Sequence, residues 1–398
     1  MKRIAMVVLA SVACAAAALA ELVPVHPVEG AEVPVQTDEA LALSGKASYE
    51  ARVSLAKKNK KEFSKNEKEK WRTAPPVILK WRATKDEHGP WKITISKTPD
   101  FKEPLVYCER HAGKEKTASG VLRTFKAERH NLEVGCTYWW KVACGAKGKT
   151  KESKPATFKT ADTPPRWIDI EGRVENIRDL GGWKTCDGRR VRQGLVFRGQ
   201  GLNDNSANGA VPGRNRLMVE DRDYLAGTLG IKTDLDLRSG RETADMKTSP
   251  LGEGVKFVHH SSEHYQRIFN KAGKKTMAKN FRVFVDEKNY PVYFHCIAGA
   301  DRTGALAYTL LGVLGVSQND AAVDWEYTFY PWMPELQKGF NRKYWRRSQH
   351  LAEGFKKYGG ENSTFKERVE LYLLDCGITK EEIEKFRSIM LEDAKEAK

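Results

Sequence analysis

The chain has 398 residues, which is enough for two or three domains with hydrophobic cores of their own. It carries 68 Lys and Arg against 52 Asp and Glu, a formal net charge of +16. This excess favours acidic partners such as phosphorylated groups, nucleic acid or anionic lipid, or it belongs simply to a soluble basic surface; it does not indicate a fold. Six of the seven cysteines lie after residue 20, and their spacing resembles no small disulfide framework.

Residues 1–20 have the pattern of a signal peptide. The basic "MKR" precedes an apolar run, and "ALA" before Glu21 fits a signal-peptidase site. The run is short for a membrane-spanning helix, although an uncleaved anchor or a lipid on Cys14 remains open. No later segment is long and apolar enough to span a membrane. We therefore expect a soluble mature chain that is periplasmic or secreted.

Residues 21–162 are predicted to form an antiparallel β-sandwich. Runs such as "PPVILKWRA", "WKITISK" and "TYWWKVACGA" read as short strands, with Pro, Gly, Asn and Asp between them. The end of the region resembles the last two strands of an immunoglobulin/fibronectin type III-like module, with Tyr138 in the tyrosine-corner region. Such modules bind, space or orient other domains. The Lys-rich segment 57–72 reads as a solvated loop or helix face, or as a polyanion-binding arm.

Two cysteines of this region, Cys136 and Cys144, are predicted to share one strand. At 3.3 Å per residue they would lie about 26 Å apart, which excludes a disulfide between them. A disulfide from Cys108 to either one stays open; otherwise these thiols are small buried hydrophobes.

Residues 163–398 begin within the linker "DTPPRW" (162–167) and then alternate between helix and strand patterns. This predicts an α/β domain with a largely parallel central sheet flanked by helices. The segment 275–289 is predicted as a helix, and the apolar helix after residue 301 should end at Gly315. Ser317 is a plausible N-cap for the next helix, and Thr379 with Glu382 forms a capping box for the last one.

The stretch "YFHCIAGADRTG", residues 293–304, carries the chemistry. A buried strand should end just before Cys296, and a buried helix should begin near Arg302. Ligands of open α/β sheets bind beyond the carboxyl ends of the strands. The loop amides and the helix N-terminus can form an anion nest, which would lower the pKa of a thiol within it. Arg302 can bind two phosphate oxygens at once.

These residues resemble the Cys-x5-Arg signature of cysteine-dependent phosphatases. The upstream segments "ENIRDLGGW", "GLVFRGQGL" and "GIKTDLDLRS" resemble blocks of the bacterial atypical tyrosine/lipid phosphatases. The resemblance covers roughly residues 170 to 390.

The resemblance implies that Cys296 is a nucleophile that forms a phosphocysteine, while Arg302 binds phosphate and stabilises the transition state. Asp301 would be general acid and then base, or else a carboxylate that braces the loop. Asp236 is the runner-up acid. The other loop positions would bind substrate: Ile297, Ala298, Gly299, Ala300, Thr303 and Gly304. Supporting positions would be His295, Arg178, Asp179, Arg198, Asp236 and Arg238.

The substrate stays open at this point. Relatives that act on phosphoinositides often carry Lys where this chain has Ala300, so phosphotyrosine or another monoester is favoured over phosphorylated lipids and inositol phosphates. The segment 270–275, "NKAGKK", could supply positive charge if it overhangs the pocket. A non-catalytic phosphate-binding module is a third possibility.

Two rival chemistries fit the sequence less well. His259, His260 and His264 could bind a metal with Cys296, but no usual zinc spacing is present, so no metal or other cofactor is predicted. A sulfur-transfer enzyme typically has four residues between Cys and Arg, and here there are five. We expect phosphorylated substrates and no nucleic acid as partners. A reversible disulfide between Cys186 and Cys296 is a further hypothesis.

Overall fold

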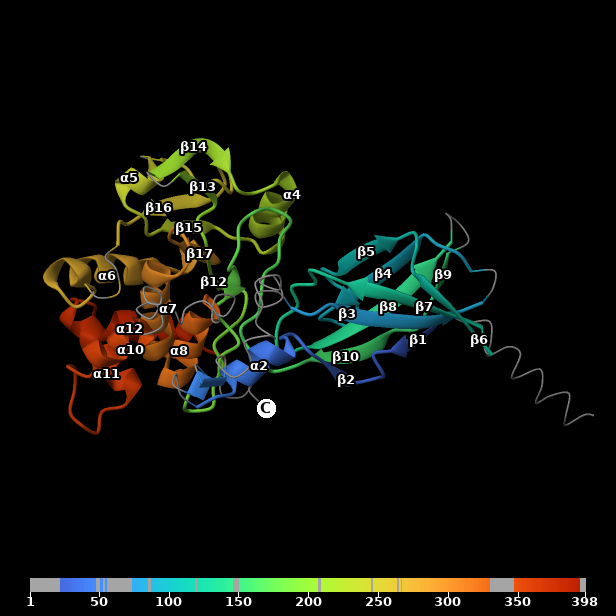
Figure 1. Ribbon diagram of the computed structural model, residues 1–398, viewed down its shortest axis with the longest axis horizontal. Helices are drawn as coiled ribbons and strands as arrows, with labels where there is room; N and C mark the ends of the chain where they lie inside the picture. Colours follow the sequence, from blue (N-terminus) through green and yellow to red (C-terminus); the bar gives the residue numbers. More distant parts are fainter. Residues whose placement is uncertain are drawn as a thin grey trace, which may run out of the picture. The chain divides into compact units, whose positions relative to one another are not determined.

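The structure is a computed structural model that describes residues 22–47, 51–52, 54–55, 74–84, 87–118, 120–145, 150–206, 209–244, 246–262, 265, 267–329 and 347–393. The predicted signal peptide and the Lys-rich segment 57–72 lie outside these residues. The chain divides into two compact units, Met1–Val35 with Pro75–Asp162 and Gln36–Ala74 with Thr163–Lys398 (Figure 1). Each unit is described by itself.

Residues 36–74 group with the second unit, although the sequence analysis placed them in the β-sandwich. The contacts are specific: the Gln36 side chain donates to the Thr163 carbonyl at 3.2 Å and accepts from the Trp167 indole at 2.9 Å. Arg52 forms a buried ion pair with Glu326 at 2.6 Å. These long-range polar contacts have no local sequence pattern.

The first unit contains two β-sheets. One has the order β1 (Val23–His26), β3 (Val77–Ala83), β7 (Gly120–Ala127) and β6 (Gly113–Thr117). The other has the order β2 (Ala31–Val33), β10 (Ala156–Thr160), β8 (Thr137–Cys144), β4 (Trp91–Ser96) and β5 (Leu105–Glu109), and β9 (Lys151–Glu152) pairs with β8.

Alternating side chains of these strands fill the core of the first unit, as period-two patterns require. Trp81 of β3 packs against Trp91 of β4 with ring centroids 5.2 Å apart, and Trp140 of β8 is fully buried. The Tyr138 hydroxyl accepts from the Glu133 amide at 2.9 Å, a contact of the kind that a tyrosine corner makes. The resemblance to a fibronectin type III module stays a prediction.

All six described cysteines are free thiols. Cys108 lies on β5 and Cys144 on β8, on opposite sides of β4. Two strand spacings amount to about 9.6 Å, too far for a disulfide.

The second unit has a five-stranded sheet of order β11 (Arg178–Asp179), β12 (Val196–Gly199), β17 (Val292–His295), β15 (Thr233–Asp236) and β16 (Lys256–His259). The last four strands are mutually parallel, and β11 joins β12 antiparallel. This confirms the predicted α/β class with a largely parallel sheet. A separate hairpin is formed by β13 (Asn203–Ser206) and β14 (Gly209–Asn215).

The described helices of this unit are α2 (Asp38–Ser44), α4 (Val219–Arg222), α5 (Gly240–Thr243), α6 (Lys271–Val283), α7 (Asp301–Leu314), α8 (Gln318–Tyr327), α10 (Arg347–Phe355), α11 (Phe365–Asp375) and α12 (Lys380–Met390). A π-helical turn, Asp223–Thr228, follows α4, and a 3-10 turn, Glu287–Asn289, precedes β17. Among the described residues, every helix is too short or too polar to cross a bilayer.

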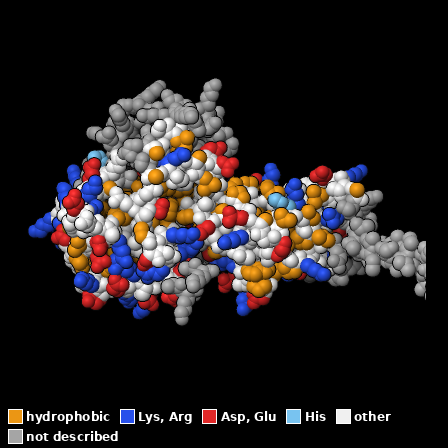
Figure 2. All heavy atoms as spheres, turned by 90° about the horizontal axis from the view of Figure 1, so that it is seen from below, with side chains coloured by type: hydrophobic (Ala, Val, Ile, Leu, Met, Phe, Trp, Pro, Cys, Tyr) orange, Lys and Arg blue, Asp and Glu red, His pale blue; other side chains and the backbone are white. Residues whose placement is uncertain are grey.

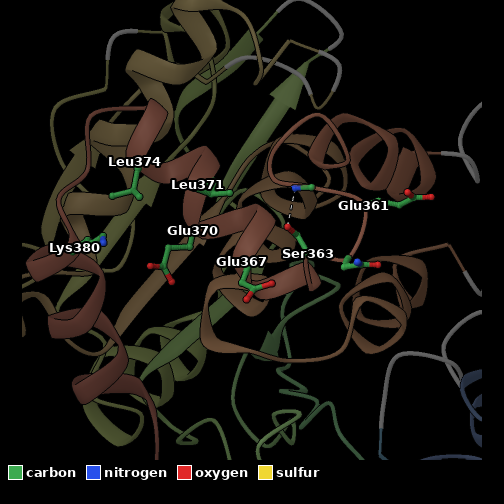
Figure 3. Close-up of a pocket in the computed structure, with 9 residues that line it drawn as sticks. Glu361, Ser363, Glu367, Glu370, Leu371, Leu374 and Lys380 are labelled. Atoms are coloured by element: carbon green, nitrogen blue, oxygen red, sulfur yellow. Dashed lines mark hydrogen bonds between the residues drawn. The ribbon is translucent and has the colours of Figure 1, made fainter.

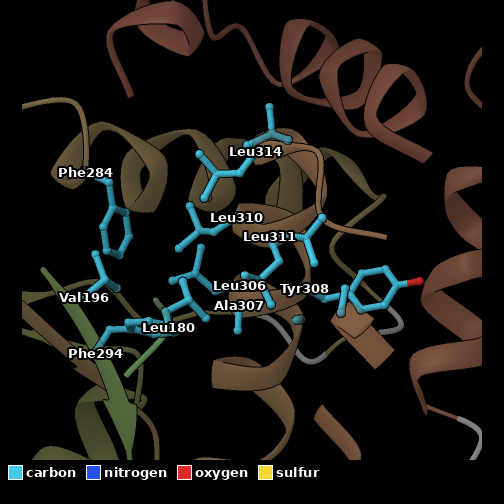
Figure 4. Packing of buried hydrophobic residues seen from close by; sticks show 14 of the residues in the cluster. Leu180, Val196, Phe284, Phe294, Leu306, Ala307, Tyr308, Leu310, Leu311 and Leu314 are labelled. Atoms are coloured by element: carbon cyan, nitrogen blue, oxygen red, sulfur yellow. The ribbon is translucent and has the colours of Figure 1, made fainter. Parts of the chain in front are cut away.

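The sheet separates two hydrophobic cores because successive side chains of a strand point to opposite faces. Val196 and Phe294 face the helices, whereas Phe197 and Tyr293 face a smaller core beside α4. Helices α6, α7, α8, α10, α11 and α12 gather on one side of the sheet (Figure 1). Helix α7 is buried on all sides from its second residue onward, with its leucines packed among these helices and strands (Figure 4).

Three predicted helix termini are confirmed. Gly315 ends α7 with φ 92°, a conformation that favours glycine. The Ser317 hydroxyl accepts from the Asp320 amide at 3.1 Å, and Thr379 and Glu382 form a reciprocal capping box. The helix predicted over 275–289 begins earlier, at Lys271, because Asn270 caps it and accepts from the Gly273 amide at 2.7 Å. Residues 271–275 are therefore helical.

Candidate active site

The candidate site lies where three parallel strands end. Strand β17 ends at His295, Cys296 opens a loop that continues through Ala300, and α7 begins at Asp301. Strands β12 and β15 flank β17 and end at Gly199 and Asp236. The strand–loop–helix arrangement predicted around Cys296 is present, at the carboxyl edge where α/β sheets bind ligands.

Every carbonyl group of the loop 296–300 is hydrogen-bonded to a donor outside the loop. The Cys296 carbonyl lies 3.1 Å from His295 Nδ1, and the Ile297 carbonyl accepts from the Gly201 amide at 3.1 Å. The Ala298 carbonyl accepts from Asn176 Nδ2 at 3.2 Å, and the Gly299 carbonyl accepts from Arg198 Nη2 at 2.9 Å. The Ala300 carbonyl accepts from the Gly304 amide at 2.8 Å. Because the carbonyls point outward, the amides are free to face the thiol, as an anion nest requires.

Gly299 is needed for this loop conformation. Its φ is 65°, and a Cβ atom there would lie 2.4 Å from the Gly199 carbonyl oxygen and 3.0 Å from Asn176 Nδ2. Both the backbone angle and the close approach exclude larger residues.

Cys296 is buried, with 3% of the residue exposed. Burial opposes its ionisation, but the Arg302 guanidinium and the nearby polar groups of Thr303 and Ala300 lower the pKa of Cys296 below its usual value. The thiolate is therefore favoured by a cation and by dipoles aimed at the sulfur, which is the environment of a reactive cysteine.

Arg302 is held by Glu242, a residue that the sequence analysis missed. Its Nη1 and Nη2 donate to the two carboxylate oxygens at 2.6 and 2.9 Å. Burial alone would raise the pKa of Glu242, but hydrogen bonds from Arg302 and Ser239 lower it to about 2. Arg302 Nε is buried without a hydrogen-bond partner among the described residues, so this donor is available to an oxyanion.

The signal for Glu242 was present in the sequence as "SGRE", residues 239–242. Ser239 and Glu242 form a capping box that begins α5. The pattern predicts the helix start, but it does not reveal that the same carboxylate reaches Arg302.

Asp324 of α8 is a second residue that the sequence analysis missed. Arg178 Nε donates to its Oδ1 at 2.9 Å, and Arg198 Nη1 donates to its Oδ2. Burial opposes the charge, but the two guanidinium groups lower the pKa of Asp324. Arg198 thus contacts the loop through the Gly299 carbonyl, and Arg178 contacts it through Asn176, as residues with a supporting role would. Asn176, in the quoted "NIRDLGG" block, links Arg178 to the loop carbonyls.

His295 has an acceptor at each ring nitrogen. Its Nδ1 faces the Cys296 carbonyl at 3.1 Å, and its Nε2 faces Asp234 Oδ1 at 3.0 Å. Burial alone would lower the pKa of His295, but the carboxylates of Asp236 and Asp234 raise it. Since a carbonyl only accepts, the protonated imidazolium satisfies both contacts. The His295 imidazolium then carries a positive charge on the residue that directly precedes Cys296.

Two other predicted positions brace the fold. Asp236 ends β15, and both its oxygens accept from Arg238 Nε at 2.9 Å, which fits a supporting role better than proton donation. Asp179 accepts from the Gly181 and Gly194 amides at 2.8 and 2.6 Å, and so stabilises a turn rather than the loop.

The remaining predicted positions differ in exposure. Asp301 is half-buried at the first position of α7, Ala298 is exposed, and Ala300 is buried.

Gly304 lies inside α7. Its amide donates to the Ala300 carbonyl, and a Cβ atom at this position would lie 2.6 Å from the Trp325 ring. Its amide is therefore not available to substrate, and glycine serves helix packing.

The hypothesis of a Cys186–Cys296 disulfide is wrong. The Cys186 amide donates to the Gly315 carbonyl at 2.8 Å, at the far end of α7 from the loop. Helix α7 has 14 residues. At 1.5 Å per residue, its length of about 21 Å separates the two sulfurs.

The histidines beside the sheet have other partners. His259 Nε2 lies 2.7 Å from the Arg238 carbonyl and His260 Nδ1 lies 3.1 Å from Asn280 Oδ1, whereas His264 lies outside the described residues. Within the described ranges, no three His, Cys, Asp or Glu side chains are arranged to hold a metal ion.

A pocket of about 610 Å³ along α11 contains none of the predicted site residues (Figure 3). Glu361, Glu367 and Glu370 line it. Glu367 caps its own helix, and Glu370 accepts from Arg387 at 2.8 Å. An acidic lining is unsuited to a phosphate group.

Comparison with known proteins gives the family. The family model described as "Tyrosine phosphatase family" matches residues 168–392, which is more than half of the chain. The chain therefore belongs to the tyrosine phosphatase family. The match includes the whole strand–loop–helix site.

Individual relatives are distant. A protein of Cupriavidus necator named as a candidate tyrosine-protein phosphatase is 28% identical over 187 residues, covering 39% of this chain and 63% of that protein. A tyrosine-protein phosphatase of Nostoc commune is 31% identical over 133 residues, covering 25% and 41%. An inositol diphosphatase of Arabidopsis thaliana is 28% identical over 141 residues, covering 31% and 69%. The chain thus spans less than two thirds of the first two relatives.

Among solved structures, the core catalytic domain of a PP-IP phosphatase from S. cerevisiae is similar to this chain with 13% identity and a TM-score of 0.25. The similarity covers 40% of this chain and 93% of that domain. A TM-score of this size does not by itself establish a shared fold.

Replacing Arg302 with Ala should raise the pKa of Cys296, because Arg302 provides the strongest of the interactions that favour the thiolate. The pH dependence of Cys296 alkylation by iodoacetamide, followed by peptide mass mapping, measures this pKa. Arg189→Ala, which removes a partly exposed guanidinium paired with Asp187, is the control. An unchanged midpoint in Arg302→Ala would contradict the electrostatic account.

Proposed function

We propose that the chain hydrolyses phosphate monoesters through a phosphocysteine intermediate on Cys296. The observation that carries the proposal is a buried, ionisable thiol inside a loop whose carbonyls are all bonded outward, with Arg302 at the start of the following helix. Membership of the tyrosine phosphatase family supports this reaction class.

In the first step, the Cys296 thiolate attacks phosphorus from the side opposite the leaving oxygen. The sulfur–phosphorus bond forms as the phosphorus–oxygen bond breaks. Loop amides and Arg302, oriented by Glu242, hold the non-bridging oxygens and stabilise the charge that they carry in the transition state. Asp301 gives its proton to the departing oxygen, so the alcohol or phenol leaves neutral.

In the second step, water attacks the phosphocysteine. Asp301, now a carboxylate, takes a proton from this water, and the sulfur leaves as a thiolate with inorganic phosphate released. The same interactions that favour the thiolate in the free protein make it a good leaving group here. No protein group is changed after one turnover.

Phosphotyrosine is the favoured substrate, with inositol phosphates or phosphoinositides as the alternative. Ala300 offers no cation inside the loop, which favours a substrate with a single phosphate at the thiol. The names of the Cupriavidus and Nostoc relatives agree with this choice, whereas the name of the Arabidopsis relative favours an inositol diphosphate. The β-sandwich unit would bind or orient partners.

Cys296→Ser should lower the turnover of p-nitrophenyl phosphate by at least about 10³-fold, because the hydroxyl is a far weaker nucleophile at neutral pH. Wild-type turnover should persist in EDTA, since no step needs a metal. Cys186→Ser, at the other end of α7, is the matched control. Retained turnover in Cys296→Ser would refute the nucleophile. Phosphopeptide binding by a wild-type protein without turnover would favour the non-catalytic module.

Asp301→Asn should slow esters with poor leaving groups far more than those with good ones, because only the former need a proton. A positioned general acid contributes about 10²- to 10⁴-fold. Comparing kcat for phenyl phosphate and p-nitrophenyl phosphate measures the difference, with Asp187→Asn as control. Equal losses on both esters would leave Asp301 as a loop-bracing carboxylate.

We also propose that the chain is exported and loses its first 20 residues. Expressed with its native N-terminus in a bacterial host, the mature protein should be recovered outside the cytoplasm, with Glu21 as its first residue by N-terminal sequencing. A cytoplasmic protein that retains Met1 would contradict export.

A further inference from the structure

The exposed face of α6 concentrates positive charge. On the face of the molecule in Figure 2, basic side chains lie among acidic ones. Helix α6 differs, because its 13 residues contain no Asp or Glu. Lys271, Lys275, Lys279 and Arg282 are exposed along one side, whereas Met277 and Phe281 are buried on the other. Residues three and four apart on a helix are neighbours, so these cations form a continuous row.

The row borders a groove of about 580 Å³ between α6 and the end of α11. Within it, Lys274 pairs with Asp375 at 2.6 Å, and Arg282 pairs with Glu382 at 2.7 Å. Lys271, Lys275 and Lys279 have no ion pair with any described residue. The groove therefore keeps three uncompensated positive charges.

This arrangement is unfavourable for α6 itself. Like charges four residues apart repel each other, and lysines in the first turns face the positive end of the helix dipole. An anionic group bound along the row would relieve both effects. The groove is concave, which fits a chain of acidic residues better than the flat surface of a lipid bilayer.

Helix α6 contacts the edge of the sheet that carries the candidate active site. Asn280 of α6 bonds to His260 at 3.1 Å and to Ser262 at 2.9 Å, and the Ser262 amide bonds to the Leu237 carbonyl just beyond β15. Asn280 is thus level with the strand ends. Helix α6 is thus joined by hydrogen bonds to the segment that follows β16 at this edge of the sheet.

We propose that the basic row of α6 binds acidic residues that flank the phosphorylated residue of a polypeptide substrate. From Lys271 to Lys279 the row is about 12 Å long, which matches about four residues of extended chain. A substrate that places a phosphate monoester at Cys296 and an acidic segment on α6 has to reach from the loop to the helix, as an extended polypeptide can. The inference rests on the proposed phosphatase activity and adds the substrate class.

The test uses the full chain and a Lys271→Glu, Lys275→Glu, Lys279→Glu variant. The control, Lys356→Glu, Lys357→Glu, Lys385→Glu, makes the same charge change at other exposed lysines. Two phosphotyrosine peptides, one with flanking Glu and one with flanking Ser, are compared. In the wild-type protein, the Glu peptide should have a lower KM than the Ser peptide. The α6 variant should raise the ratio of KM for the Glu peptide to KM for the Ser peptide by about tenfold, because each of the three exposed ion pairs contributes a factor of about two. The control should not change it. An unchanged ratio in the α6 variant, or an equal change in the control, would overturn the inference.

A binding measurement separates this inference from the proposed activity. Fluorescence anisotropy of an unphosphorylated Glu-rich peptide with Cys296→Ser protein should show salt-sensitive binding that the α6 substitutions weaken. If no ester is hydrolysed, the proposed activity fails while this result still decides the role of α6. If inositol hexakisphosphate or anionic vesicles bind through the α6 lysines and the peptide does not, the polypeptide assignment is wrong.

Discussion

The outward hydrogen bonding of the loop 296–300 is the constraint on which the site depends. A loop amide can face the thiol only if its neighbouring carbonyls are turned away, and buried carbonyls need donors. Those donors come from a strand end, from Asn176, from Arg198 and from α7 itself. Segments far apart in the chain are therefore needed to make one anion-binding loop.

Buried charges serve the same loop. Asp324 lies between Arg178 and Arg198, and Glu242 holds Arg302 by two hydrogen bonds. Removing one member of such a buried pair leaves an uncompensated charge, so these pairs define the geometry more than they add stability. The Arg302 guanidinium is held by Glu242 without any ligand, as the proposed binding of a phosphate oxygen would require.

Local patterns were sufficient for the strand–loop–helix arrangement around Cys296 and for the helix ends. Cys296, Arg302, Gly315 and the Thr379 capping box each depend on residues within one short segment. Glu242, Asp324 and the grouping of residues 36–74 with the second unit could not be predicted in this way, because their partners are 60 or more residues away. The start of α6 was missed for a different reason: Asn270 is a good N-cap, but "KAGKK" reads as a polar loop.

Trapping the intermediate tests the central claim most directly. Asp301→Asn protein mixed with a reactive aryl phosphate and quenched in acid should carry one phosphate on Cys296, because loss of the base slows attack by water more than formation of the adduct. Peptide mass mapping locates the modified residue. A phosphate on Cys296 is the predicted result; continued turnover with no adduct, or with the phosphate on another residue, would contradict the account.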